Sequence, residues 1–220
     1  MKRIFIFGLA LALTAILAAG ASTAERKGMI GVGVGGGAGL PLGSFKDTTG
    51  IGAKLGWRAG VGVGYFVTND IAIGASGALG QNKAKDEKLS ALQSADSNVT
   101  DAKAQLLELG AWVKYFFKME SEKIAPYVTL GLGGNSLKLK VTPDTAFADS
   151  ANSNLTESEM FLGGKIGVGA MFQVSPTASI FVEGALHNYA KKDFSPINYI
   201  AAQAGVVFMF GGSGGGGGTE

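Results

Sequence analysis

The chain contains long segments in which apolar side chains recur at every second position. Between residues 54 and 66, one set of alternate positions runs from Leu55 through Trp57 to Tyr65 and is wholly apolar or aromatic. The other set contains Arg58 and four glycines. A period of two places successive side chains on opposite faces of a β-strand. The same division recurs in segments 103–117 and 157–172, so each is predicted to be an amphipathic strand.

Eight such segments follow one another along the chain. We expect strands at 28–42, 54–66, 71–81, 103–117, 125–140, 157–172, 177–189 and 198–210. The connections at 67–70, 118–124 and 173–176 are short, and those at 43–53, 82–102, 141–156 and 190–197 are longer and polar. Within the second of these longer segments, DEKLSALQSA is expected to be a solvated loop, with a short helix as the alternative. Alternating short and long connections predict an antiparallel up-and-down arrangement.

The alternation alone fits either a soluble β-sandwich or a membrane barrel. Two features favour the barrel. Strands of eleven or more residues suit a tilted membrane crossing, which needs about nine to eleven. Aromatic residues also gather where the short turns are, as in the interfacial belt of a membrane barrel. The residues expected in this aromatic girdle are Tyr65, Phe66, Tyr115, Phe117, Tyr127 and Phe172.

The first 24 residues have the pattern of a signal peptide. Met1-Lys2-Arg3 is a basic start, an apolar run follows from Ile4 to Ala19, and Ser22-Thr23-Ala24 fits the small-x-small rule for cleavage. A retained anchor is the alternative, although the run is shorter than the eighteen or more residues that span a bilayer. We therefore divide the chain into a signal peptide (1–24), a barrel (25–210) and a flexible Gly-rich tail (211–220).

Composition excludes several kinds of chemistry. The chain has no cysteine, which rules out disulfides, thiol catalysis and cysteine-ligated metal sites. Removing Lys2 and Arg3 with the signal leaves the mature chain formally neutral, so no basic excess points to a nucleic acid partner. No motif indicates a metal site or any other cofactor, and we expect none.

Glycine is unusually frequent, with 36 residues, and it is concentrated on one face of the predicted strands. Residues 31–36 satisfy the G-x-G-x-x-G spacing of a dinucleotide-binding loop, but the strand before it and the helix after it are missing, and Pro41 follows. Because the interior of an eight-stranded barrel is only just wide enough for side chains, we expect glycine to make room there. The side chains expected to fill this space are Arg58, Glu108, Trp112, Lys114, Phe116, Phe161, Lys165, Phe181, Glu183 and Gln203.

Five of these side chains are charged. We expect Arg58, Glu108, Lys114, Lys165 and Glu183 to form a charge cluster in the lumen. In a narrow interior such charges must pair, because a charge left without a partner is costly. A paired cluster would block the bore. The alternative is a wider channel in which each charge is hydrated separately.

His187 is the only histidine. Its position near the loop end of a strand predicts a residue at the rim of the lumen or on the surface. A catalytic group with Ser195 and Glu183 is conceivable, but no motif positions these residues, so we expect no catalytic residues and no enzyme. A lipid-modifying outer-membrane enzyme is held as the least favoured alternative.

The last predicted strand carries a more specific signal. Gln203, Gly205, Phe208 and Phe210 match the pattern polar-x-Gly-x-x-aromatic-x-aromatic. With the signal peptide and eight amphipathic strands, this resembles the bacterial outer-membrane β-barrels of the OmpA/OmpX type. The resemblance implies an all-β, eight-stranded antiparallel up-and-down transmembrane β-barrel in the Gram-negative outer membrane. It further implies contact with outer-membrane lipid and lipopolysaccharide, and insertion by the barrel assembly machinery with these four residues as the assembly signal.

Two functions are consistent with this resemblance. The first is a structural role in membrane integrity, or surface interaction through loops whose ligand is unknown, with the lumen plugged by ion pairs. The second is a narrow porin-like channel for ions or small solutes.

Overall fold

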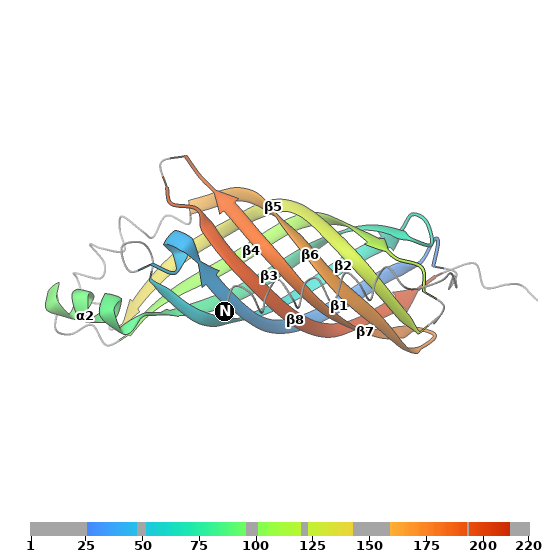
Figure 1. The fold of residues 1–220 in the computed structure, drawn as a ribbon, viewed down its shortest axis with the longest axis horizontal. Helices are drawn as coiled ribbons and strands as arrows, with labels where there is room; N and C mark the ends of the chain where they lie inside the picture. Colours follow the sequence, from blue (N-terminus) through green and yellow to red (C-terminus); the bar gives the residue numbers. More distant parts are fainter. Residues whose placement is uncertain are drawn as a thin grey trace, which may run out of the picture.

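The chain forms a closed barrel of eight antiparallel strands (Figure 1). The computed structural model describes residues 26–47, 52–95, 101–119, 123–142, 159–192 and 194–211. The strands are β1 (Ile30–Leu42), β2 (Ala53–Phe66), β3 (Ile71–Ala84), β4 (Asp101–Phe116), β5 (Ile124–Thr142), β6 (Glu159–Ser175), β7 (Ala178–Ala190) and β8 (Ile197–Phe210). Each strand pairs with the next, and β1 pairs with β8 to close the sheet. The predicted fold class is confirmed.

Several strands are longer than the alternation of apolar residues predicts. β3 continues to Ala84 and β5 to Thr142, and β4 already begins at Asp101. These polar ends pair with one another, so the ladder of backbone hydrogen bonds extends beyond the apolar belt. The turn predicted at 173–176 is also shorter, because β6 runs to Ser175 and β7 begins at Ala178. Periodicity of apolar residues marks the part of a strand that faces lipid, not the whole strand.

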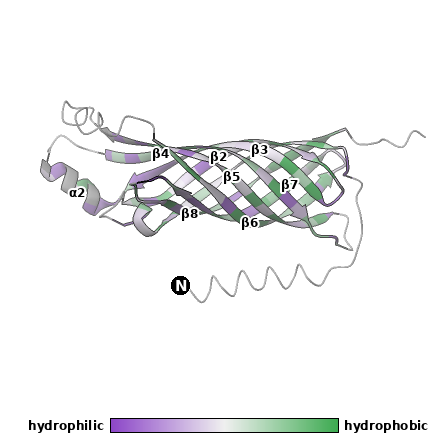
Figure 2. Ribbon diagram, turned by 90° about the horizontal axis from the view of Figure 1, so that it is seen from above, coloured by the Kyte–Doolittle hydropathy of each residue, from purple (hydrophilic) through white to green (hydrophobic). Residues whose placement is uncertain are grey.

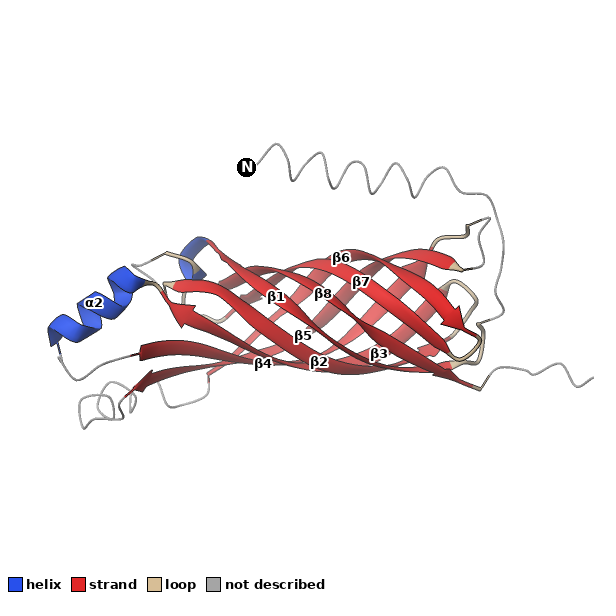
Figure 3. Cartoon of the chain, turned by 90° about the horizontal axis from the view of Figure 1, so that it is seen from below, coloured by secondary structure: helices blue, strands red, loops and turns tan. Residues whose placement is uncertain are grey.

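Two short helical segments lie at the end of the barrel that carries the long connections (Figure 3). One is a 3-10 turn, η1 (Gly43–Phe45), and the other is α2 (Asp86–Ala95). Our expectation of a loop over the segment DEKLSALQSA was therefore wrong. The segment has no glycine or proline, and the acidic Asp86 and Glu87 in its first turn favour the positive end of a helix. Among its described side chains, Asp86, Glu87, Ser90, Gln93 and Ser94 are exposed, as expected for a solvated segment.

No helix in the described parts of the chain is long and apolar enough to cross a membrane. The predicted signal peptide (1–24) and residues 212–220 of the tail lie outside the described residues.

The outer face of the barrel is apolar, as the alternation predicts. Large side chains that would be buried in a soluble protein stand out from it, with exposed fractions of 62% for Leu55, 51% for Trp57 and 77% for Leu132. Figure 2 shows hydrophobic residues along the barrel and more hydrophilic ones towards α2. An exposed apolar belt of this size is expected of a barrel whose solvent is lipid.

The residues predicted for the aromatic girdle divide between the outer face and the lumen of the barrel. Tyr65, Tyr115 and Phe172 point outward, and Phe117 lies against Tyr115 in the turn that follows β4, with ring centroids 5.2 Å apart. Phe66 and Tyr127 were wrongly included, because they point into the barrel and are only 4% and 1% exposed. Phe66 shares the alternate positions of Arg58 along β2, and that parity faces the lumen.

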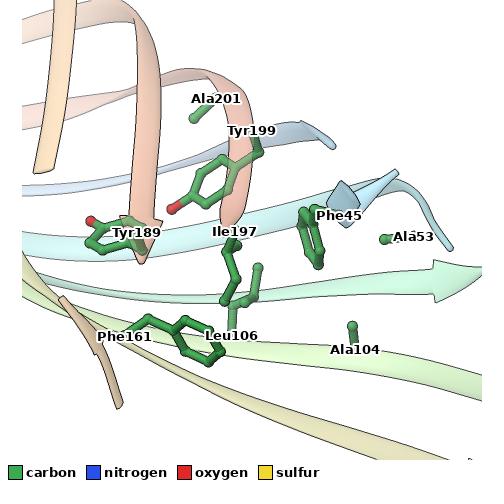
Figure 4. Packing of buried hydrophobic residues seen from close by; sticks show 9 residues of the cluster. All are labelled: Phe45, Ala53, Ala104, Leu106, Phe161, Tyr189, Ile197, Tyr199 and Ala201. Carbon is green, nitrogen blue, oxygen red and sulfur yellow. The ribbon is translucent and has the colours of Figure 1, made fainter. Parts of the chain in front are cut away.

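The lumen is filled by two apolar layers, one towards each end. The loop-end layer, shown in Figure 4, consists of Phe45, Ala53, Ala104, Leu106, Phe161, Tyr189, Ile197, Tyr199 and Ala201. The turn-end layer consists of Phe66, Ala72, Phe116, Ala125, Tyr127, Met171 and Met209, with Met29, Trp112 and Val207 packed against it. Phe45 comes from η1 and is 1% exposed, so the first long connection folds into the mouth of the barrel.

Candidate functional site

A layer of polar side chains lies between the two apolar layers. Along β4, Glu108 follows Leu106 of the loop-end layer and precedes Phe116 of the turn-end layer. Along β6, Lys165 lies between Phe161 and Met171 in the same way. We call this the central polar layer, and its members are Arg58, Glu108, Lys114, Lys165, Glu183, His187 and Gln203.

Glu108 is the centre of the first group of contacts in this layer. Its Oε2 atom lies 2.8 Å from Nη2 of Arg58, and both side chains are almost fully buried. The hydroxyl of Tyr199 donates to the same oxygen, and Nδ1 of His187 lies 3.2 Å from it. The Arg58 guanidinium also lies 4.4 Å from the centre of the Tyr199 ring. A buried carboxylate with this many partners is well compensated for its loss of hydration.

Glu183 is the centre of the second group. Nζ of Lys114 lies 2.7 Å from its Oε2 atom, and the Tyr127 hydroxyl donates to the same oxygen at 3.0 Å. The other oxygen, Oε1, accepts a hydrogen bond from Nε2 of Gln203 at 3.0 Å. The Lys114 ammonium also lies 4.2 Å from the centre of the Tyr127 ring, a favourable cation–π arrangement.

These contacts cross the bore of the barrel. In the closed order from β1 to β8, strand β4 lies opposite β8 and three strands away from β7. Glu108 of β4 nevertheless bonds Tyr199 of β8, and Lys114 of β4 bonds Glu183 of β7. The side chains therefore span the lumen at this level instead of lining its wall.

The glycines leave space for these and other large side chains, as expected. A Cβ atom added at Gly64 or Gly74 would lie 2.4 Å from the Trp112 ring. One added at Gly35 or Gly205 would lie 2.8 or 2.6 Å from the Phe181 ring. Real Cβ atoms do not approach other atoms this closely, so the bare backbone of these strands is what admits the rings. Glycine on the inner face therefore determines which large residues the lumen can hold.

The five predicted lumen charges all lie inside the barrel. Four of them form two separate ion pairs, and the fifth forms none. Arg58 pairs with Glu108, and Lys114 pairs with Glu183. Lys165 makes no ion pair within the described part of the chain. The predicted fillers Trp112, Phe116, Phe161, Phe181 and Gln203 also point inward.

The prediction for His187 was wrong. The side chain is 4% exposed and contacts Glu108 and the Tyr199 hydroxyl deep in the lumen, not at its rim or on the surface. Ser195 lies exposed in the connection before β8, and the hydrogen bonds of Glu183 go to other residues. The hypothetical catalytic group is therefore not assembled.

In the described residues, no group of three or more His, Asp or Glu side chains is arranged to hold a metal.

Three residues in or beside the polar layer were not predicted to lie in the lumen: Tyr127, His187 and Tyr199. For His187 and Tyr199, the alternation of side chains along the strand indicates the inward direction. Tyr199 and Gln203 are four residues apart on β8, as are His187 and Glu183 on β7, so each pair shares a face. Extending the inward parity along β7 and β8 would have placed His187 and Tyr199 in the lumen.

The four residues of the C-terminal pattern divide between the two faces of β8. Gln203 and Gly205 point inward, where they contact Glu183 and make room for Phe181. Phe208 and Phe210 point outward and are 48% and 56% exposed. Phe210 pairs with Ile30 of β1 at the end of the seam that closes the barrel.

Comparison with known proteins decides the family. Residues 9–210 match the family described as outer membrane protein beta-barrel domain. The chain belongs to this family. A barrel of this family lies in the outer membrane, surrounded by lipid and lipopolysaccharide. A comparison with curated protein sequences gives no match.

Solved structures of outer-membrane proteins have the same fold. Neisserial surface protein A is 15% identical with a TM-score of 0.59, and the match covers 84% of this chain and 100% of that one. A major outer membrane protein from Thermus thermophilus is 14% identical with a TM-score of 0.53, covering 83% and 99%. OprG from Pseudomonas aeruginosa is 12% identical with a TM-score of 0.52, covering 86% and 98%. At these identities the likeness shows the fold alone.

Proposed function

We propose that this protein is a small outer-membrane barrel with a closed lumen, and that it acts in membrane integrity or surface contact, not as an open pore. The observation that carries the proposal is the pair of contacts across the bore, Glu108 with Tyr199 and Lys114 with Glu183. Apolar layers lie on both sides of them. Solute passage would require these buried bonds to break, which makes steady conduction unfavourable.

In this proposal, the long connections at one end of the barrel make the surface contacts. We infer that these connections face the cell exterior and the short turns face the periplasm, since outer-membrane barrels have this asymmetry. In this orientation α2 and η1 lie outside. Protease added to intact cells is expected to cut within 82–102 or 141–156. Cleavage only after the outer membrane is disrupted would contradict the orientation.

A narrow channel is the second candidate, supported by a cavity in the lumen. The cavity has a volume of about 140 Å³ and is lined by glycines of β1 and β2 together with the central polar layer. If the ion pairs exchange partners, this cavity would form part of a continuous path for ions through the lumen.

Recording single channels from refolded protein in planar bilayers separates the two candidates. The closed barrel predicts no large, steady conductance in the wild type, and at most small, intermittent events. Glu183→Ala and Glu108→Ala are expected to increase conduction, because each removes a carboxylate that holds side chains across the bore. A large, steady wild-type conductance that both substitutions leave unchanged would support the pore instead.

We also propose that the protein is not an enzyme. Its only histidine is buried inside the barrel, away from lipid, with Glu108 and Tyr199 as partners. Assays for hydrolysis of phospholipid or lipid A in detergent are expected to give no activity. Activity that disappears in His187→Ala would overturn this proposal.

A further inference from the structure

The cavity in the lumen is lined by more positive than negative side chains. Its cationic residues are Arg58, Lys114 and Lys165, and its carboxylates are Glu108 and Glu183. His187, which also lines it, adds a further positive charge whenever it is protonated. The charge that the described wall presents to the cavity is therefore positive overall.

Both carboxylates already have several partners. Glu183 accepts from Lys114 and Tyr127 at one oxygen and from Gln203 at the other. Glu108 is held by Arg58, Tyr199 and His187. Neither carboxylate forms an ion pair with Lys165, so the surplus charge is located on this one ammonium group.

Glu183 acts on Lys165 only at longer range, without a hydrogen bond or ion pair, and no carboxylate besides Glu108 and Glu183 lines this cavity. A Cβ atom added at Gly131 would lie about 3.0 Å from the Lys165 side chain, so the aliphatic stem runs along the bare backbone of β5. Its cross-strand neighbour on β7 is His187, which is neutral or positive. The Nη1 atom of Arg58 is buried without a hydrogen-bond partner in the described structure, so the pair with Glu108 leaves one donor of this guanidinium unused.

We propose that the cavity binds a small monovalent anion, such as chloride, with the Lys165 ammonium as its principal ligand. Lys165 is half-buried and has no paired carboxylate, and a positive wall concentrates anions from solution around such an ammonium group. The cavity volume of about 140 Å³ exceeds the 10–15 Å³ that one water needs, so it also admits a small anion. The site is independent of whether the lumen conducts.

Bromide is a suitable probe because it resembles chloride and scatters anomalously. The full chain is refolded in sodium bromide or, at the same ionic strength, in sodium gluconate, whose anion is much larger and carries its charge on a carboxylate. We expect anomalous diffraction from bromide-grown crystals to place an ion within hydrogen-bond distance of Lys165 Nζ. We also expect the thermal unfolding midpoint to rise with bromide concentration and then saturate, relative to gluconate, since a ligand that binds only the folded state stabilises it.

Three variants test the role of the wall charges. Lys165→Met is expected to lose the bromide-dependent rise in midpoint. Glu183→Gln is expected to enlarge it, because the wall becomes more positive. Lys138→Met, which removes an exposed lysine on the outer face, is the matched control and is expected to keep the wild-type response.

The outcomes that overturn the proposal are distinct from failure of the closed barrel. Bromide peaks at exposed lysines alone would indicate an adventitious ion only, and would contradict the site. Equal unfolding midpoints of the wild type in the two salts would contradict it too. A bromide response retained in Lys165→Met would also contradict it. If that variant does not fold, the wild-type diffraction experiment decides. Conductance, the readout for the closed lumen, enters none of these outcomes.

Discussion

The turn-end layer and the central polar layer fill the same lumen in different ways. At the turn end, rings lie against glycines, as Trp112 does against Gly64 and Gly74, and the space is taken up by shape. In the central layer, charged side chains reach across the bore to partners on distant strands, and a cavity is left beside them. The turn-end layer depends on small residues in the wall. The central layer depends on the ion pairs of Arg58 with Glu108 and of Lys114 with Glu183.

This difference predicts that the two layers fail for different reasons. Removing an atom from the polar layer leaves a buried charge uncompensated, whereas adding an atom to the wall of the turn-end layer forces a ring to move. The following substitutions test this contrast, beginning with the largest expected effect.

Glu108→Ala is expected to be the most damaging. It leaves the buried Arg58 guanidinium without its carboxylate, and breaking a buried pair costs about 3–5 kcal/mol of unfolding free energy. Urea unfolding in detergent micelles, followed by the gel mobility of folded and unfolded barrel, measures this. The control is the double variant Arg58→Met with Glu108→Leu, which removes both charges. We expect the double variant to recover most of the loss, and equal stability of the two variants would contradict the importance of pairing.

Gly64→Ala is expected to have an intermediate effect. Its new Cβ would lie 2.4 Å from the Trp112 ring, and overpacking of this kind costs about 1–3 kcal/mol. The matched control is Gly184→Ala on β7, where no atom lies within 4 Å of the added Cβ, so its stability should stay at the wild-type level. Trp112→Leu in the Gly64→Ala background should restore part of the loss. If Gly64→Ala and Gly184→Ala behave alike, shape does not limit the turn-end layer.

Phe210→Ala is expected to change stability least, because its ring is on the outer face of the same end and is 56% exposed. Loss of such a contact in refolded protein should stay below about 1 kcal/mol. The effect should instead appear in cells as a lower membrane-inserted fraction, measured by fractionation, if Phe210 belongs to the assembly signal. Deleting residues 212–220 is the control and should change little. A silent Phe210→Ala together with a tail deletion that abolishes insertion would contradict the assignment.

Much of this structure could be predicted from the sequence, because a strand that faces lipid on one side and a narrow lumen on the other has a strict period of two. That period is sufficient for eight strands, their order and the inward direction of Arg58, Glu108 and Glu183. It does not specify which charges meet. Lys114 and Lys165 carry the same charge on inward positions, but only the first pairs with Glu183, since strand stagger sets the depth of each residue.

Errors arose where a residue was assigned by its type instead of its parity. Phe66 and Tyr127 were placed in the girdle because they are aromatic and near the turns, and His187 was placed at the rim because it is polar and near a loop. In each case the alternation along the strand directs the side chain into the lumen. The helix α2 lay beyond this rule, because its sequence has no strand period.

A double-mutant cycle on Lys114 and Glu183 tests the closure of the lumen most directly. The unfolding free energies of wild type, Lys114→Met, Glu183→Leu and the double variant are measured in the same detergent. Because the two side chains bond across the bore at 2.7 Å, the effects of the single substitutions should not add, with a coupling energy of about 0.5–3 kcal/mol. Effects that add to within about 0.5 kcal/mol would show that the two charges are hydrated separately, and would contradict a lumen closed by ion pairs.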